Sequence, residues 1–206
     1  MSVTLPGDLP VDLPIACFDD ADAWERWLSA HGDADGVWLK IAKKGKGVTT
    51  VTYAEALDVA LCHGWIDGQK RSCDAVYFLQ RFTPRRARSL WSRINIGHVE
   101  RLTLAGRMKD GGLQQVERAK GDGRWDAAYA GAAVMQVPDE LQKALGENDK
   151  AMTTFQSLDK TNRYAVCWRV HTAKKPETRL SRARSLAAML ANGETIHPVT
   201  RKKPAG

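Results

Sequence analysis

Several features that would assign this chain to a familiar class are missing from it. Its four cysteines lie far apart, with no C-x-x-C spacing and no histidine at ligand spacing; they are Cys17, Cys62, Cys73 and Cys167. We therefore predict neither a metal site nor a cofactor. No stretch approaches the roughly 20 apolar residues that span a bilayer, and no basic region followed by an apolar one opens the chain. These absences predict a cytoplasmic protein with reduced thiols and no membrane segment.

The composition is that of an ordinary globular protein with a basic bias. With 206 residues, 43% of them hydrophobic and 27% charged, the chain can bury a sizeable core. Its formal net charge is +7 and its pI is about 9.3, which favours anionic partners without identifying one. An anionic small molecule, an anionic peptide and nucleic acid are all open as partners, and the oligomeric state is unknown.

The rest of the chain is organised around residues 64–95, where much of the positive charge gathers. This segment holds two acids and seven basic residues. Its polar turns and its aromatic and β-branched runs predict strands near 65–72 and 75–82. Thr83-Pro84 ends the second strand, because proline has no N–H to donate to a sheet. A cationic loop then leads into a helix.

The arginines of this segment admit two interpretations. In the first they form an anion site, since arginine forks match carboxylate or phosphate oxygens two at a time and like charges held together repel unless an anion lies between them. In the second, Arg81 and Arg85 pair internally with the segment's two acids, Asp67 and Asp74. The first interpretation gives these ligand-binding candidates: Arg81, Arg85, Arg86, Ser92, Asn95 and Trp65.

Two tryptophans and two titratable residues complete this set. Trp65 and Trp91 are expected to be core anchors, because large aromatic side chains dominate burial. Asp67 is a candidate acid–base group beside the arginines. His63 ends a helix that the capping box Thr52–Glu55 opens, and it is the second catalytic candidate.

The predicted fold class is α+β. A small antiparallel sheet, with strands near 36–43, 65–72 and 75–82, is expected to be covered by helices. We place this core domain at residues 15–130. An all-helical C-terminal region at residues 138–195 is expected to pack on it.

The composition of the segments between these elements predicts their structure. Residues 1–14 hold three prolines and are expected to form an extended surface arm. Gly111-Gly112 is expected to break the helical pattern before a short helix at 113–119. Residues 126–137 are small and alanine-rich and are the best candidate linker, and the tail at 198–206 is expected to be disordered.

Several motifs occur in the order found in one known family. The N-terminal group comprises Glu55-Ala56-Leu57, Gly64-Trp65-Ile66-Asp67-Gly68, Gln80-Arg81-Phe82-Thr83-Pro84-Arg85-Arg86, Ser89-x-Trp91-Ser92-x-x-Asn95, Val99-Glu100-Arg101-Leu102, Gly106-Arg107-Met108 and Gly123-x-Trp125. The C-terminal group comprises Pro138 to Leu145, Trp168 and Ala173-Lys174-x-Pro176-Glu177-Thr178-Arg179. From about Trp24 to Gly193 the chain resembles the bacterial YdeI/OmpD-associated family, also labelled bacteriocin-protection. The resemblance implies a role in tolerating bacteriocins or envelope stress, and it brings no catalytic set.

Three functions from different classes follow. The first is a cytoplasmic protein of bacteriocin or stress tolerance that binds an anionic ligand through its arginine-rich site. The second is an enzyme that uses Asp67, with His63, as an acid–base group on an anionic substrate. The third is a nucleic-acid-binding protein, which the pI and the interleaving of tryptophan with arginine favour although no helix-turn-helix, RNP or GXXG motif is present.

Overall fold

The computed structural model describes residues 10, 12–130 and 135–198. The chain divides into two compact units, residues 1–129 and residues 130–206, and each is treated by itself below. Most of the expected N-terminal arm, the middle of the expected linker and most of the expected tail lie outside the described residues.

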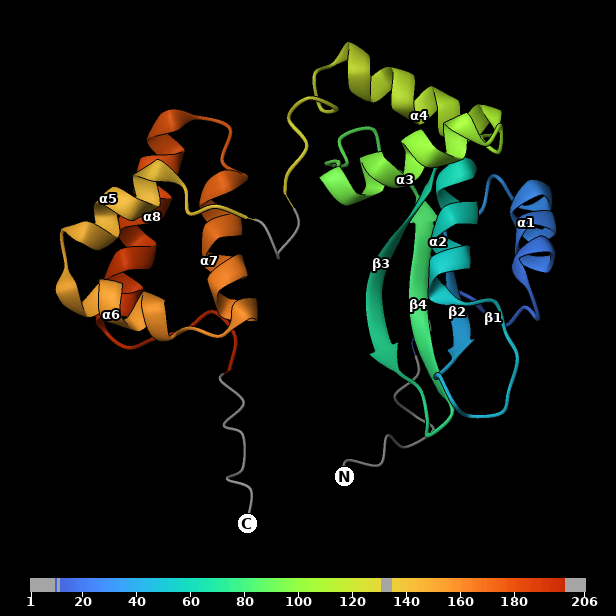
Figure 1. Ribbon diagram of the computed structural model, residues 1–206, viewed down its shortest axis with the longest axis horizontal. Coiled ribbons are helices and arrows are strands. Elements are labelled where there is room, and N and C mark those ends of the chain that lie inside the picture. Colours follow the sequence, from blue (N-terminus) through green and yellow to red (C-terminus); the bar gives the residue numbers. More distant parts are fainter. Residues whose placement is uncertain (1–9, 11, 131–134, 199–206) are drawn as a thin grey trace. The chain divides into compact units, whose positions relative to one another are not determined.

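The N-terminal unit combines a sheet with four helices among its described residues (Figure 1). Its elements in chain order are β1 (Ile15–Ala16), α1 (Ala21–Ala30), β2 (Val37–Ala42), α2 (Tyr53–Cys62), β3 (Trp65–Ser72), β4 (Tyr77–Pro84), α3 (Arg93–Leu104) and α4 (Asp110–Gly121). Helices α1 and α2 lie on one face of the sheet, and α3 and α4 lie near one end of it (Figure 1). The α+β fold class predicted from the sequence is confirmed.

The sheet has the strand order β1-β2-β4-β3. The three strands expected from the sequence are β2, β3 and β4, and they pair antiparallel. The additional strand β1 pairs parallel to β2, so the sheet as a whole is mixed. With two residues, Ile15 and Ala16, β1 is too short to show the alternation from which a strand is predicted.

Alternation along β2 places different residues on the two faces of the sheet. Val37, Leu39 and Ile41 belong to the core cluster that also includes residues of all four helices. Trp24 of α1 lies within this cluster; its ring centroid is 5.7 Å from that of Phe82 and its Nε1 donates to the Ala56 carbonyl at 3.1 Å. The core therefore joins α1, α2 and the sheet.

Trp38 points to the other face of the sheet and is still fully buried. Its Nε1 donates to Asp12 Oδ1 at 2.9 Å, and Arg71 lies over its ring at 5.3 Å from the centroid. Asp12 belongs to the segment that the sequence predicts to be a surface arm. Asp12 therefore binds the sheet through a specific hydrogen bond to Trp38.

The helix α4 begins three residues earlier than the sequence predicts, because Gly111-Gly112 opens it instead of breaking it. A Cβ on Gly111 would lie 2.7 Å from the His63 carbonyl oxygen, and one on Gly112 would lie 2.3 Å from the Cys62 carbonyl oxygen. The Lys109 N–H donates to the same Cys62 oxygen at 3.1 Å. The glycines are thus required where α4 packs against the end of α2, a reason that a local pattern does not contain.

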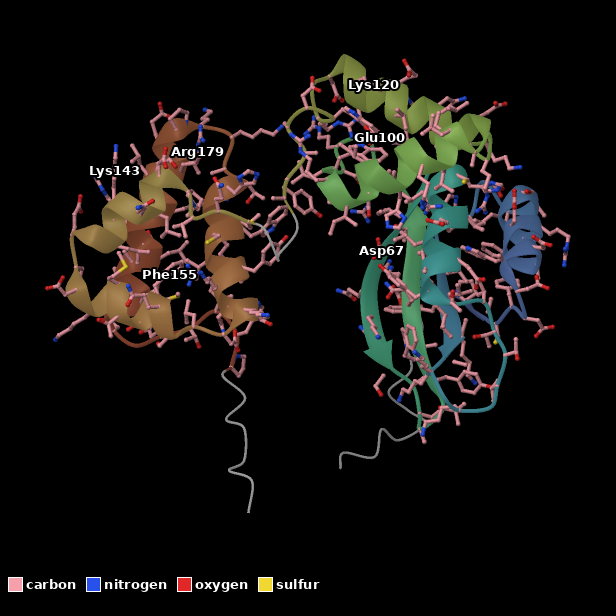
Figure 2. All side chains as sticks on the ribbon, in the orientation of Figure 1. Asp67, Glu100, Lys120, Lys143, Phe155 and Arg179 are labelled. Atoms are coloured by element: carbon pink, nitrogen blue, oxygen red, sulfur yellow. The ribbon has the colours of Figure 1, made fainter. Side chains whose placement is uncertain are left out.

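The C-terminal unit is helical in its described part. Its elements are α5 (Asp139–Gly146), α6 (Asp149–Ser157), α7 (Lys160–His171) and α8 (Pro176–Ala191). Phe155, which is 3% exposed, lies among these helices in their shared core (Figure 2). Arg179 Nε lies 3.5 Å from Glu140 Oε1 and so links α8 to α5. The predicted all-helical C-terminal region is confirmed; its packing on the core domain stays a prediction.

One buried polar residue ties the end of this unit together. Asn162 on α7 is fully buried. Its side-chain amide donates to the His197 carbonyl at 3.2 Å, and its Oδ1 accepts from the His197 N–H at 2.8 Å. The segment after α8 is therefore held to α7 by two hydrogen bonds.

We predict that Trp65→Ala destabilises the N-terminal unit by about 3–5 kcal/mol, because truncation of a buried aromatic leaves a cavity. Trp65 is 2% exposed, and its ring lies edge-on to that of Trp24 at 6.4 Å. Chemical denaturation measures the change. Leu104→Ala, at a position 91% exposed, is the matched control and should change the free energy of unfolding by less than about 0.5 kcal/mol. A similar small loss in both variants would contradict a core role for Trp65.

Candidate functional site

The site centres on Arg85, the residue that follows β4. Its backbone N–H donates to the Gly64 carbonyl at 3.0 Å, which fixes the chain where β4 ends. Its side chain is buried, with the residue 5% exposed, and its Cζ lies 3.7 Å from the centroid of the Trp91 ring. One terminal nitrogen donates to the Leu90 carbonyl at 3.2 Å. The guanidinium is thus held flat against Trp91 inside the protein.

Burial makes this cation electrostatically unfavourable. Desolvation lowers the pKa of Arg85 to about 10, and the positive charge of Arg124 acts in the same direction. Tyr129 and Asp67 partly offset this effect. Arg85 makes no ion pair within the part of the chain that the structure describes. Because its pKa still lies well above neutrality, a buried positive charge persists at pH 7.

Arg124 brings a second guanidinium to the same place. Its Nε donates to both carboxylate oxygens of Asp122 at 2.8 Å, and its Nη1 donates to the Ser89 carbonyl at 2.8 Å. The neighbouring Trp125 ring lies 5.0 Å from the Trp91 ring. Arg124 is therefore anchored at Nε and Nη1. Its Nη2 has no hydrogen-bond partner among the described residues.

Three buried N–H groups of this cluster have no hydrogen-bond partner among the described residues: Arg85 Nε, Arg124 Nη2 and Trp91 Nε1. We call these side chains the buried donor cluster. A buried donor without an acceptor costs about 1–3 kcal/mol, and more when it is charged. Such groups call for an acceptor from outside the chain, either an anion or ordered water. An anion would in addition compensate the charge of Arg85, which water does not, whereas Arg124 is already paired with Asp122.

The three arginines named from the sequence are not gathered into one site. Arg81 lies on the outer face of the sheet, 5.9 Å from the Trp38 ring, and its Nη2 is 3.3 Å from Asp12 Oδ2. Arg86 is exposed. Only Arg85 belongs to the buried donor cluster. The alternative prediction pairs Arg81 and Arg85 with Asp67 and Asp74. The described residues contain no such ion pair, although the charge of Asp67 acts on Arg85.

Asp67 accepts a hydrogen bond from the Tyr53 hydroxyl at 2.8 Å and projects from β3 (Figure 2). Burial, with the nearby Asp67 charge, raises the pKa of Tyr53. Asp74 instead closes the turn before β4, where its Oδ1 accepts from the N–H groups of Val76 and Tyr77 at 2.7 Å. Asp67 thus joins β3 to α2, and Asp74 stabilises a local turn.

His63 and Asp67 contact different residues. Its Nε2 is 3.7 Å from Glu25 Oε1, and Lys109 Nζ binds the same oxygen at 2.9 Å. Desolvation lowers the pKa of His63 and outweighs the opposing effect of Glu25. The two catalytic candidates are therefore not joined as a hydrogen-bonded acid–base pair. Over the described ranges, no group of three or more histidine, cysteine or acidic side chains could hold a metal ion.

Of the remaining predicted residues, Ser92 and Trp65 have structural roles. Ser92 is the N-cap of α3; its Oγ accepts from the Asn95 N–H at 3.1 Å. Asn95 is half-buried in the first turn of that helix. Trp65 is in the core and cannot serve as an exposed ligand platform.

The sequence analysis missed Arg124, which lies 39 positions after Arg85. The signal was present in the Gly123-x-Trp125 motif, whose tryptophan packs against Trp91. Arg124 stands between its two named residues. Its position beside Arg85 depends on the fold of the loop after α4.

Two family models match different parts of the chain. Residues 134–193 match the family described as "Bacteriocin-protection, YdeI or OmpD-Associated", which confirms the resemblance for the C-terminal region. Residues 16–115 match a different model, a domain of unknown function named DUF8412, and most of the N-terminal motifs quoted above fall there. No curated protein and no solved structure matches the chain. No described helix is long and apolar enough to cross a membrane.

We predict that acid weakens the N-terminal unit partly through His63. Its pKa is lowered in the folded state, so between that value and the ordinary 6.5 the unfolded chain binds more protons. The stability that neutral His63 contributes is therefore present above pH 6.5 and is lost as the pH falls through the folded pKa. Denaturation at pH 7.5 and at about pH 5.5 measures the loss, which should be smaller in His63→Gln.

The control for this experiment is His31→Gln, at an exposed position of the same unit. It should lose as much stability on acidification as the unaltered protein. Equal losses in all three proteins would show that protonation of His63 does not contribute.

Proposed function

We propose that this protein binds an anionic ligand at the buried donor cluster and that this binding serves a bacteriocin- or stress-tolerance role. The single observation that carries the proposal is the set of three unpaired buried donors on Arg85, Arg124 and Trp91. The tolerance role rests on the family description that residues 134–193 match.

The chemistry of the cluster favours a small oxyanion over water. Arg85 and Arg124 repel each other, as the effect of Arg124 on the pKa of Arg85 reflects. Water accepts hydrogen bonds but leaves this repulsion in place, whereas a carboxylate or phosphate group removes it. The Trp91 N–H adds a neutral donor beside the two charged ones. The ligand class is therefore a carboxylate or a phosphate.

We place the protein in the cytoplasm. All four cysteines are free, and Cys62 and Cys167 are buried, which is typical of proteins kept in a reducing compartment. The enzymatic role of Asp67 and the binding of nucleic acid stay predictions. No contact described above favours either of them over ligand binding.

Inorganic phosphate is the probe for this site. At fixed ionic strength, balanced with chloride, phosphate should raise the thermal midpoint of the protein, since a ligand that binds only the folded state stabilises it. A gain of about 1 kcal/mol corresponds to about 2–4 °C in a chain of this size. Arg85→Met should remove the gain. Differential scanning calorimetry measures the midpoints.

The matched control is Arg86→Met, which makes the same change at the adjacent exposed position and should keep the gain. It also corrects for the general stabilisation that excluded anions give. If Arg85→Met does not fold, Arg124→Met tests the same cluster. Equal gains in thermal midpoint for Arg85→Met, Arg86→Met and the unaltered protein would mean that the cluster binds no anion and holds water instead.

A further inference from the structure

The connection from β4 into α3 carries a second unusual surface, separate from the buried donor cluster. No aspartate or glutamate occurs between Asp74 and Glu100. Within this stretch two large aliphatic side chains are exposed: Leu90 is 47% exposed and Ile94 is 58% exposed. Single exposed apolar residues are common on proteins, so the neighbours of these two decide their meaning.

Exposed arginines flank both aliphatic side chains. Arg86 and Arg88 precede Leu90, and Arg93 precedes Ile94 directly. Among the described residues, the hydrogen bond given for the Arg93 side chain is a long one of 3.5 Å, to the backbone carbonyl of Asp126. We call the five residues the 86–94 surface: Arg86, Arg88, Leu90, Arg93 and Ile94.

Hydrogen bonds fix the backbone in the middle of this surface. Trp91, between the two aliphatic residues, is 2% exposed and is anchored in the core. Its carbonyl accepts from the Tyr129 N–H at 3.0 Å, and the Arg93 N–H donates to the Tyr129 carbonyl at 2.9 Å. Leu90 and Ile94 are four residues apart, so their backbones lie within about 14 Å of each other. Two exposed aliphatic side chains thus lie on the same short stretch of chain as three exposed arginines.

We propose that the 86–94 surface docks on an anionic lipid bilayer. Arginine binds lipid phosphates bidentately, and Lys or Arg near an anionic membrane strengthens binding about fivefold per residue. Leu90 and Ile94 supply the apolar contact that reaches the boundary between headgroups and acyl chains. The arrangement attaches the protein to a membrane surface without a spanning helix.

Nucleic acid is the competing partner for a basic surface, and the side chains disfavour it. Proteins that bind single strands stack bases on exposed aromatic rings. Here Trp91 is buried, and the exposed apolar side chains are Leu90 and Ile94, which have no ring to stack. Branched aliphatic groups suit a lipid surface better than a base.

Cosedimentation with vesicles tests the proposal. The protein should bind mixed phosphatidylcholine–phosphatidylglycerol vesicles and bind pure phosphatidylcholine vesicles far more weakly. The double variant Leu90→Ser/Ile94→Ser should lower the partition coefficient about tenfold or more, because the apolar contact is lost. Arg88→Gln should lower it about fivefold, and only on the anionic vesicles.

Leu104→Ser is the matched control. Leu104 ends α3, the helix that contains Ile94, and is 91% exposed but lies outside the 86–94 surface. It should bind as the unaltered protein does. The proposal is overturned if the double variant keeps full vesicle binding while folded, as judged by its thermal midpoint. It is also overturned if a single-stranded RNA oligonucleotide binds more tightly than vesicles and independently of Leu90 and Ile94. The double variant leaves the three donors of the buried donor cluster in place and should keep the phosphate-dependent rise of the thermal midpoint, so the two proposals fail separately.

Discussion

The stacking of Arg85 on Trp91 is the interaction on which the site depends. A guanidinium with only 5% of its residue surface exposed needs acceptors, and the described part of the chain supplies one carbonyl and an aromatic face. Arg124, although paired with Asp122, lowers the pKa of Arg85 further. A position of this kind is costly unless an acceptor completes it, and this cost is what supports the proposed ligand.

The position of Arg85 depends on how α2 packs against α4. Its N–H binds the carbonyl of Gly64, and the region around Gly64 is where α2 meets α4. A Cβ on Gly64 would lie 2.5 Å from the Gly111 carbonyl oxygen, and its φ of 79° also disfavours other residues. A side chain at either glycine would push α4 away and loosen the turn that positions Arg85. The site and the helix junction therefore share one constraint.

Local patterns predicted most of the fold and little of the site. Alternation revealed β2, and the capping box at Thr52 revealed α2, because both depend on neighbouring residues. The partners of the arginines could not be found in this way. Arg81 binds Asp12, a residue 69 positions away, and Arg124 approaches Arg85 from a loop after α4. Charge density alone gave no reason to prefer one arginine as a ligand-binding residue. In the structure, only Arg85 of the three is buried.

The double hydrogen bond between Asn162 and His197 bears on where the C-terminal unit ends. The family match stops at residue 193, close to the end of α8. The fully buried Asn162 amide, however, finds its donor and its acceptor four residues further on. A chain shortened at residue 193 would keep every helix and leave this amide unsatisfied in the interior. The hydrogen-bonded structure of the C-terminal unit thus extends beyond the residues that match the family.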